Sequence, residues 1–237
     1  MASTLRYALA VFVALGLSGT QLARCAESGT AATKAKPSPT DISKERGWKD
    51  LFDGKTLGDW KRTDFFKGGD VKVDPKFRGG AGAIVVSAGE LLNGINWTKD
   101  MPKTNYEVYV ESMKIDGKDF MLGLTFPVAD SYASLILGGW GGMVVGISSI
   151  DHMDASENET TKGITFENDR WYKVRLKVTP AKLEAWLDDK QIVDVKLKDK
   201  TISLRFGDIK KSIPLGLATY QTSAAYRAIK LRKLDAK

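Results

Sequence analysis

Short segments in which apolar and polar residues alternate account for most of this chain. Residues 106–115 and 171–178 place apolar side chains at every second position, whereas residues 120–126, 132–137 and 143–150 are apolar almost without interruption. Period-two alternation predicts strands with one buried face, and the continuous apolar runs predict strands that are covered on both faces. No long segment has the periodicity of an amphipathic helix, so the pattern predicts an all-β protein.

Turn signals separate the predicted strands at short intervals. Residues 171–197 predict a three-stranded meander, in which Asp188-Asp189 forms the turn before the last strand. Ala88-Gly89 predicts the turn of a hairpin within residues 83–93. Many short strands joined by turns are typical of a β-sandwich. The sequence therefore predicts a single domain over residues 47–237, with a concanavalin A-like jelly-roll fold of two antiparallel sheets.

The start of the chain has a different composition. Residues 1–26 combine Arg6, an apolar core too short to span a bilayer and small residues near the end, which together predict a secretory signal peptide. A lipid anchor on Cys25 is disfavoured because Arg24 stands where a lipoprotein signal carries a small residue. Residues 27–46 are small, polar and charged, which predicts a flexible linker. We therefore expect a secreted or periplasmic protein without a membrane span.

Composition excludes several kinds of site. Cys25 is the only cysteine and lies in the predicted leader, so the mature domain has no disulfide, thiol nucleophile or thiolate metal site. His152 is the only histidine, which excludes a zinc site of several histidines. Removal of the leader lowers the net charge from +7 to about +5, and basic residues are interspersed with acidic ones. We therefore expect no nucleic-acid partner.

Residues 134–163 contain the side chains best suited to a site. Trp140 lies between two pairs of glycines, which adopt backbone conformations closed to other residues and leave the indole uncrowded. Such an indole can stack on the apolar face of a sugar ring, so Trp140 is a candidate substrate-binding residue. The alternative is a tryptophan that fills the edge of the sandwich while the glycines form a bulge.

An acidic loop follows at residues 151–159. Its carboxylates are hard oxygen ligands, which Ca²⁺ and similar divalent cations prefer, and its histidine can accept a proton near neutral pH. The candidate roles are catalysis for His152, Asp151 and Glu157, substrate binding for Asn158, and metal binding for Asp154 and Glu159. The alternative is an ordinary solvated loop, because the spacing matches no standard calcium-binding loop.

Two other segments resemble a known family. Residues 51–57, Leu-Phe-Asp-Gly-Lys-Thr-Leu, are closed by Trp60 and resemble the start of the 3-keto-disaccharide hydrolase domain. Residues 168–175 and 185–189, which include Trp-Tyr-Lys-Val-Arg and Ala-Trp-Leu-Asp-Asp, are similar to the tryptophan-containing meander of that family. The resemblance implies a concanavalin A-like jelly roll over nearly the whole mature chain. It does not extend to the pocket, because residues 119–126 lack the arginine that many members carry there.

The resemblance also implies a reaction. In that family a ketone at C3 of the sugar acidifies the C2 proton, so one base can start elimination of the glycosidic oxygen, and water then adds to the product. We therefore expect a carbohydrate-directed hydrolase or lyase that acts on 3-keto-disaccharides. The alternatives are a non-catalytic, lectin-like carbohydrate-binding module, with or without calcium, and a plain interaction domain. The sequence gives no indication of the oligomeric state.

Overall fold

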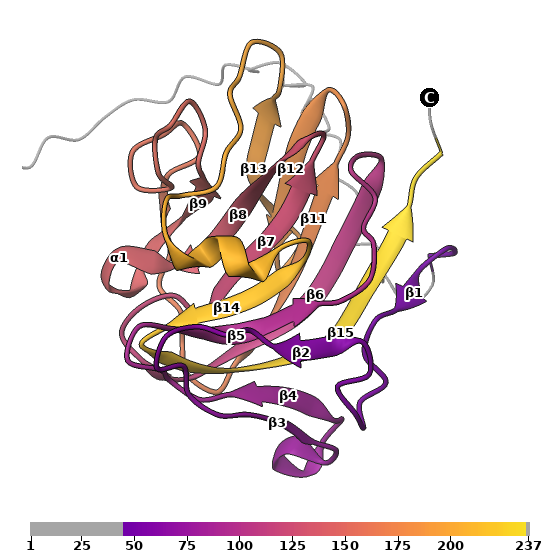
Figure 1. Cartoon of the computed structure of the whole chain (residues 1–237), viewed down its shortest axis with the longest axis vertical. Helices are drawn as coiled ribbons and strands as arrows, with labels where there is room; N and C mark the ends of the chain where they lie inside the picture. Colours follow the sequence, from indigo (N-terminus) through magenta and orange to yellow (C-terminus); the bar gives the residue numbers. More distant parts are fainter. Residues whose placement is uncertain (1–44, 236–237) are drawn as a thin grey trace, which may run out of the picture. The chain divides into compact units, whose positions relative to one another are not determined.

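The computed structural model describes residues 45–235, which form a sandwich of two antiparallel β-sheets (Figure 1). One sheet contains β1 (Lys49–Asp50), β3 (Val71–Asp74), β4 (Ala83–Val86), β6 (Tyr106–Gly117), β11 (Trp171–Val178), β12 (Lys182–Leu187), β13 (Lys190–Lys196) and β15 (Thr222–Lys233). The other contains β2 (Trp60–Arg62), β5 (Leu92–Trp97), β7 (Leu122–Val128), β8 (Ser131–Gly138), β9 (Val144–Ser148), β10 (Lys162–Gly163) and β14 (Gly216–Tyr220). The predicted all-β sandwich is confirmed.

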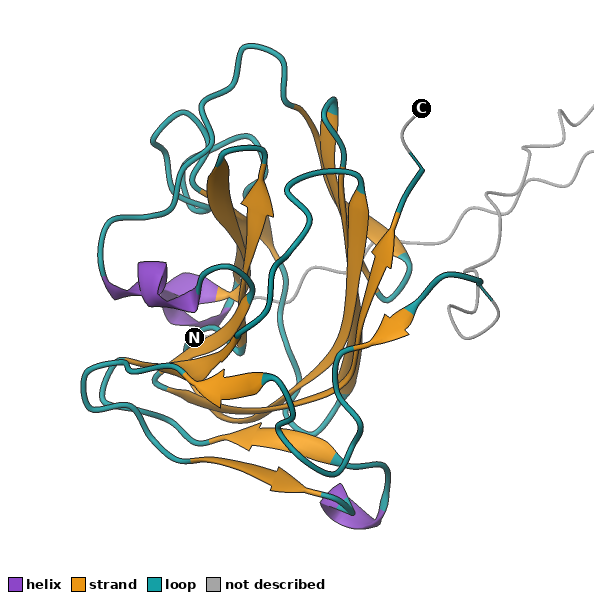
Figure 2. Ribbon diagram, turned by 45° about the vertical axis from the view of Figure 1, so that its right-hand side comes forward, coloured by secondary structure: helices purple, strands orange, loops and turns teal. Residues whose placement is uncertain are grey.

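Both sheets combine runs of consecutive strands with pairs of strands that are distant in the chain. The eight-stranded sheet has the order β13-β12-β11-β6-β15-β4-β3, with β1 paired to β15, and the seven-stranded sheet has the order β10-β9-β8-β7-β14-β5-β2. In the described part of the chain, three short helices connect strands: η2 (Phe77–Gly79), α1 (Gly139–Gly142) and η3 (Asp208–Ser212). Figure 2 shows α1 and η3 on the outer side of the seven-stranded sheet, so these two segments cover part of this face.

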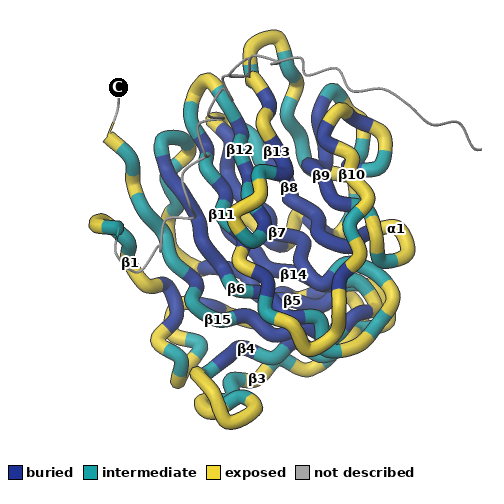
Figure 3. The backbone as a smooth tube through the Cα atoms, turned by 180° about the vertical axis from the view of Figure 1, so that it is seen from behind, coloured by how far each residue is buried: buried dark blue, intermediate teal, exposed yellow. Residues whose placement is uncertain are grey.

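The inner faces of the two sheets form one hydrophobic core, drawn in dark blue in Figure 3. In the eight-stranded sheet, Val108 and Val110 of β6 stand opposite Leu176 and Val174 of β11, and all four are fully buried. These are the apolar positions of the two alternating segments, so their alternation reflects one buried face. All residues of β7 are buried, as its continuous apolar run predicts.

The hairpin predicted within residues 83–93 is wrong. β4 pairs with β3 and β15 in the eight-stranded sheet, whereas β5 pairs with β2 and β14 in the seven-stranded sheet. The turn at Ala88-Gly89 therefore joins the two sheets instead of two neighbouring strands. Gly69 packs against this turn so closely that a Cβ there would lie 2.5 Å from the carbonyl oxygen of Ala88. These contacts come from distant parts of the chain, so local alternation could not reveal them.

The three-stranded meander predicted for residues 171–197 is confirmed as β11, β12 and β13. The predicted signal peptide, residues 1–26, and all but the last two residues of the predicted linker lie outside the described residues, and both stay predictions. Within residues 45–235, no helix has the length and apolar character that crossing a membrane requires.

Candidate functional site

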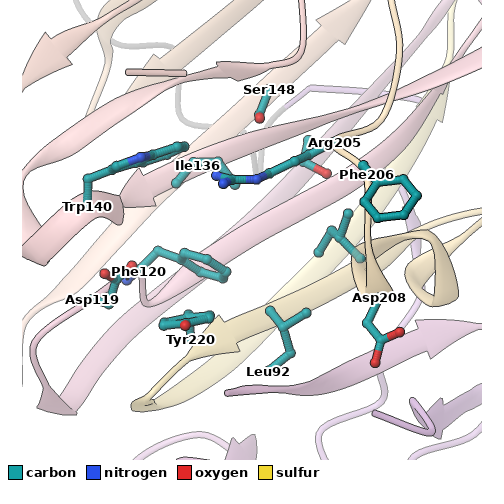
Figure 4. A pocket seen from close by; sticks show the side chains of 12 residues that line it. Leu92, Asp119, Phe120, Ile136, Trp140, Ser148, Arg205, Phe206, Asp208 and Tyr220 are labelled. Atoms are coloured by element: carbon teal, nitrogen blue, oxygen red, sulfur yellow. Dashed lines mark hydrogen bonds between the residues drawn. The ribbon is translucent and has the colours of Figure 1, made fainter. Parts of the chain in front are cut away.

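A cavity of about 380 Å³ opens on the outer face of the seven-stranded sheet, in the range of small-molecule sites (Figure 4). Ser134 and Ile136 of β8 line it because the alternate residues Leu135 and Leu137 point into the core. Leu92 of β5, Ser148 of β9 and Tyr220 of β14 complete the sheet's contribution to the lining. The walls come from the loop before β7, from α1, and from the segment that leads into η3.

Trp140 stands at the edge of this cavity because α1 is an irregular turn. Positive φ angles occur at Gly138, Trp140, Gly141 and Gly142, with 49° at the tryptophan itself. The carboxylate of Asp119 holds the turn by accepting a hydrogen bond from the Gly141 N–H at 3.0 Å. Trp140 is 41% exposed and lines the cavity, so it does not fill the interior of the sandwich.

Arg205 lies against Trp140, with its Cζ atom 5.4 Å from the centroid of the indole. Backbone hydrogen bonds between Ser203 and Ser149, at 2.8 and 3.2 Å, align the segment before Arg205 with the end of β9. The chain therefore carries Arg205 and Phe206 across the outer face of the sheet. The side chain of Arg205 is 55% exposed, and Phe206 is fully exposed.

A second depression shares Arg205 and Phe206 with the cavity, so the two adjoin. It is the smaller of the two when the open space at the mouths is included, at about 760 Å³ against about 990 Å³. Its other lining residues are Ser149, His152, Asp154, Ser203 and Leu204, which make it the more polar of the two. His152 is exposed there. The structure thus brings the predicted indole and part of the predicted acidic loop to one continuous opening, with Arg205 between them.

Three carboxylates of the acidic loop, Asp151, Asp154 and Glu159, form ion pairs with basic side chains. Asp154 accepts hydrogen bonds from Ser148 and Ser149 through one oxygen, while its other oxygen lies 3.1 Å from Arg205. Lys200 lies 3.0 Å from both Asp151 and Glu159. A hydrogen bond from the Thr201 N–H and the contact with Lys200 hold the pKa of Asp151 below its ordinary value.

These contacts do not fit a cation site. Asp154 and Glu159, the predicted metal ligands, are bound to different basic residues. Over residues 45–235, no three or more histidine, cysteine, aspartate and glutamate side chains are grouped so that they could hold a metal ion. Within the described residues these carboxylates therefore form no ligand set for the predicted divalent cation, which stays a prediction.

Asn158 and Glu157 have other surroundings. The side-chain amide of Asn158 is buried, donates to the carbonyls of Ile147, Met153 and Asp154, and accepts hydrogen bonds from Thr160. Its hydrogen bonds thus shape the loop. Glu157 is exposed, and neither residue lines the two depressions.

A comparison with protein families now identifies the scaffold. The model of the 3-keto-alpha-glucoside-1,2-lyase-like domain matches residues 47–232. The chain belongs to this family. The resemblance seen in the opening segment and in the meander is therefore confirmed.

Solved structures share the sandwich of this lyase-like domain. The apo Crh5 transglycosylase has a TM-score of 0.53 at 11% identity, covering 80% of this chain and 84% of that one, and the Crh5 complex with NAG has a TM-score of 0.52. A candidate glycosyl hydrolase from Parabacteroides distasonis has 15% identity and a TM-score of 0.49, with 84% and 99% coverage. The similarity to the two Crh5 structures shows the fold alone. No curated protein matches the sequence.

Sequence reasoning missed several lining residues of this lyase-like domain. Arg205 and Phe206 lie between β13 and η3, where the sequence offered no periodic pattern to interpret. The available signal was a basic and an aromatic residue side by side in such a connection and followed by Gly207. In the structure this glycine has a φ of 120°. Phe120 was read as the start of a strand, but it precedes β7 and lines the cavity.

Proposed function

We propose that this chain cleaves 3-keto-glycosides and that the glycoside lies across the two adjoining depressions. Membership of the 3-keto-alpha-glucoside-1,2-lyase-like family supports this chemistry. The observation that carries the proposal is the position of Arg205. Its guanidinium packs against Trp140 and lines both the larger cavity and the depression that contains His152. A stacking surface and the chain's only histidine therefore lie on either side of one positive charge.

The proposed reaction begins when a base removes the proton from C2, next to the ketone at C3. The electrons of the C2–H bond form an enolate, whose negative charge lies on the keto oxygen. The enolate then expels the glycosidic oxygen from C1, which leaves a double bond between C1 and C2, and the departing oxygen takes up a proton. Addition of water to this double bond gives net hydrolysis. The reaction therefore needs a base and a positive group at the keto oxygen.

Two residues suit these roles. His152 is the candidate base because it is exposed in the smaller depression. Arg205 is the candidate partner of the keto oxygen, since a guanidinium offers five N–H donors and the ion pair with Asp154 involves one of its nitrogens. Asp151 and Glu157 suit the role of base less well: Lys200 and Thr201 bind the first, and the second lines neither depression.

Non-catalytic carbohydrate binding is the second candidate function. It is favoured by the partners of the carboxylates that line the opening. Asp119 accepts hydrogen bonds from the N–H groups of Phe120 and Gly141, Asp154 pairs with Arg205, and Asp208 lies 3.3 Å from Lys211. A binding module needs only an aromatic surface and hydrogen-bond donors, and both are present.

Turnover of a 3-keto-disaccharide separates the two functions. We expect His152→Gln to lower kcat by at least about 100-fold, the usual contribution of a general base. Trp140→Ala should raise KM roughly tenfold, which corresponds to about 1.4 kcal/mol of binding free energy. Trp186→Ala is the matched control, because Trp186 has the same 5.4 Å contact with an arginine but lies in the eight-stranded sheet. It should change neither constant.

Other outcomes point elsewhere. Saturable binding of a glycoside without turnover, weakened by Trp140→Ala but not by His152→Gln, would support the binding module. Full activity of His152→Gln would remove His152 as the base, and the same assay on Asp151→Asn and Glu157→Gln would then test the remaining candidates.

A further inference from the structure

The two depressions differ in chemistry. The larger one is walled mainly by apolar side chains, namely Leu92, Phe120, Ile136, Trp140, Ile209 and Tyr220. In Figure 4 the rings of Phe120 and Tyr220 lie together across from Trp140 and Arg205, and their centroids are 5.9 Å apart. The smaller depression offers Ser149, Ser203 and His152 instead. Groups that bind in the two places should therefore differ in polarity.

Most polar side chains of the larger cavity already have partners. The hydroxyl of Ser134 is hydrogen-bonded to that of Thr125 at 2.8 Å, and the hydroxyl of Ser148 donates to Asp154 at 2.9 Å. Asp119 accepts two backbone N–H groups, and Asp208 contacts Lys211. Apart from Tyr220 and from Arg205, which the smaller depression shares, the wall has few free donors or acceptors. Most hydroxyls of a sugar ring in this cavity would lose water without gaining a partner, which weakens binding.

We propose that the larger cavity is an aglycone site that takes a flat aromatic group, while the sugar occupies the smaller depression. This inference rests on the proposed function and names its substrate class, the 3-keto-glycosides of aromatic alcohols. A phenyl ring would meet the indole of Trp140 and the rings of Phe120 and Tyr220 without leaving polar groups unpaired.

The leaving group supports the same assignment. In the elimination, the bond between C1 and the glycosidic oxygen breaks and the oxygen leaves with the electron pair. A phenol has a pKa of about 10, so a phenoxide leaves without a proton from an acid. The carboxylates of the larger cavity are bound to N–H groups or to Lys211, so none stands ready to protonate a sugar alkoxide. Solvent protonates the phenoxide after it departs.

Binding of ordinary glucosides tests the site without any turnover. We expect phenyl glucoside to bind about tenfold more tightly than methyl glucoside or a glucose disaccharide in isothermal titration calorimetry. Leu92→Asn places an amide in the apolar wall and should weaken phenyl glucoside about fivefold, with methyl glucoside unchanged. Leu91→Asn is the matched control, because Leu91 is 44% exposed and does not line the cavity.

If Leu92→Asn does not fold, Trp140→Ala tests the same cavity, since Trp140 is already partly exposed. It should reduce the preference for phenyl over methyl glucoside. A disaccharide that binds as tightly as phenyl glucoside, or variants that weaken both glucosides equally, would overturn the aglycone site. Aryl selectivity without turnover of any 3-keto-glycoside would contradict the proposed function but leave the aglycone site standing. Turnover of disaccharides without aryl selectivity would support the proposed function and overturn the aglycone site.

Discussion

The outer faces of both sheets carry an arginine packed against a tryptophan, but the surroundings of the arginine differ between the two faces. On the eight-stranded sheet, Arg227 packs over Trp171 with its Cζ atom 4.0 Å from the ring centroid, and Arg175 packs over Trp186 at 5.4 Å. On the seven-stranded sheet, Arg205 packs over Trp140 at 5.4 Å. The contact between arginine and indole is therefore the same in kind, and the surroundings decide what it does.

Carboxylates make the difference. In the eight-stranded sheet, the side chain of Glu107 is 1% exposed and binds both Arg175 and Arg232, whose side chains are 27% and 16% exposed. Arg205 in contrast is 55% exposed, and its one carboxylate partner, Asp154, is shared with two serines. The first arrangement leaves the guanidinium groups little capacity for a ligand and suits a stabilising role. The second leaves N–H donors that a ligand can bind.

The largest expected effect comes from removing the charge of Glu107, which binds two guanidinium groups on the eight-stranded sheet. Glu107→Gln keeps the shape of the side chain but removes the buried one of the two carboxylates that Arg175 and Arg232 share, and leaves them only Glu45. We expect the free energy of unfolding to fall by about 3 kcal/mol in urea denaturation. Glu184→Gln is the control on the same sheet, because Glu184 makes only long contacts, with Lys177 at 3.5 Å and with the Gln191 amide at 3.4 Å. It should cost less than about 1 kcal/mol, and equal costs would refute the contrast.

The next effect concerns the turn that presents Trp140. Asp119→Ala removes the acceptor of the Gly141 and Phe120 N–H groups. Because both bonds involve a charged acceptor but are partly exposed, we expect a loss of about 1–2 kcal/mol in unfolding free energy. The fluorescence of Trp140, compared with a Trp140→Phe background, should also shift towards that of a solvated indole. Asp116→Ala, at an exposed position of β6, should change neither property.

Arginine-to-lysine changes compare the two faces directly. Lysine keeps the charge but loses the planar fork of donors and the stacking on indole. Arg205→Lys should lower kcat/KM for a 3-keto-glycoside about tenfold with little change in melting temperature. Arg175→Lys should do the opposite, because its donors are bound to Glu107. If both variants lost stability and kept activity, Arg205 would belong with the structural arginines.

These contrasts show where sequence reasoning succeeded and where it stopped. Alternation located β6 and the meander because their apolar positions point to the core at every second residue. The glycines around Trp140 correctly indicated an uncrowded indole. The partners of the acidic loop were out of reach, since Lys200 and Arg205 come from a connection about 50 residues later with no periodic pattern. Pairing between distant segments also explains why the turn at Ala88-Gly89 was taken for a hairpin.

The smallest effect is a dependence on pH in the acidic loop. The Thr201 N–H and, to a lesser extent, Lys200 hold the pKa of Asp151 below its ordinary value of 3.8. The folded protein therefore takes up this proton less readily than the unfolded chain. The stabilisation is fully present above that ordinary value and is lost as the pH falls through the lowered pKa. Melting temperatures of Asp151→Asn and wild type should thus differ slightly at pH 6 and converge at lower pH.

Salt can resolve the two causes of this pKa shift. Lys200 acts partly through its charge, which about 1 M NaCl screens at an exposed site, whereas the hydrogen bond from the Thr201 N–H does not depend on a distant charge. Because the Thr201 hydrogen bond is the larger cause, most of the difference between wild type and Asp151→Asn at pH 6 should persist in high salt. A difference that vanished in salt would make Lys200 the main partner. The loop would then be held mainly by a screened surface ion pair, unlike the buried pairs of Glu107.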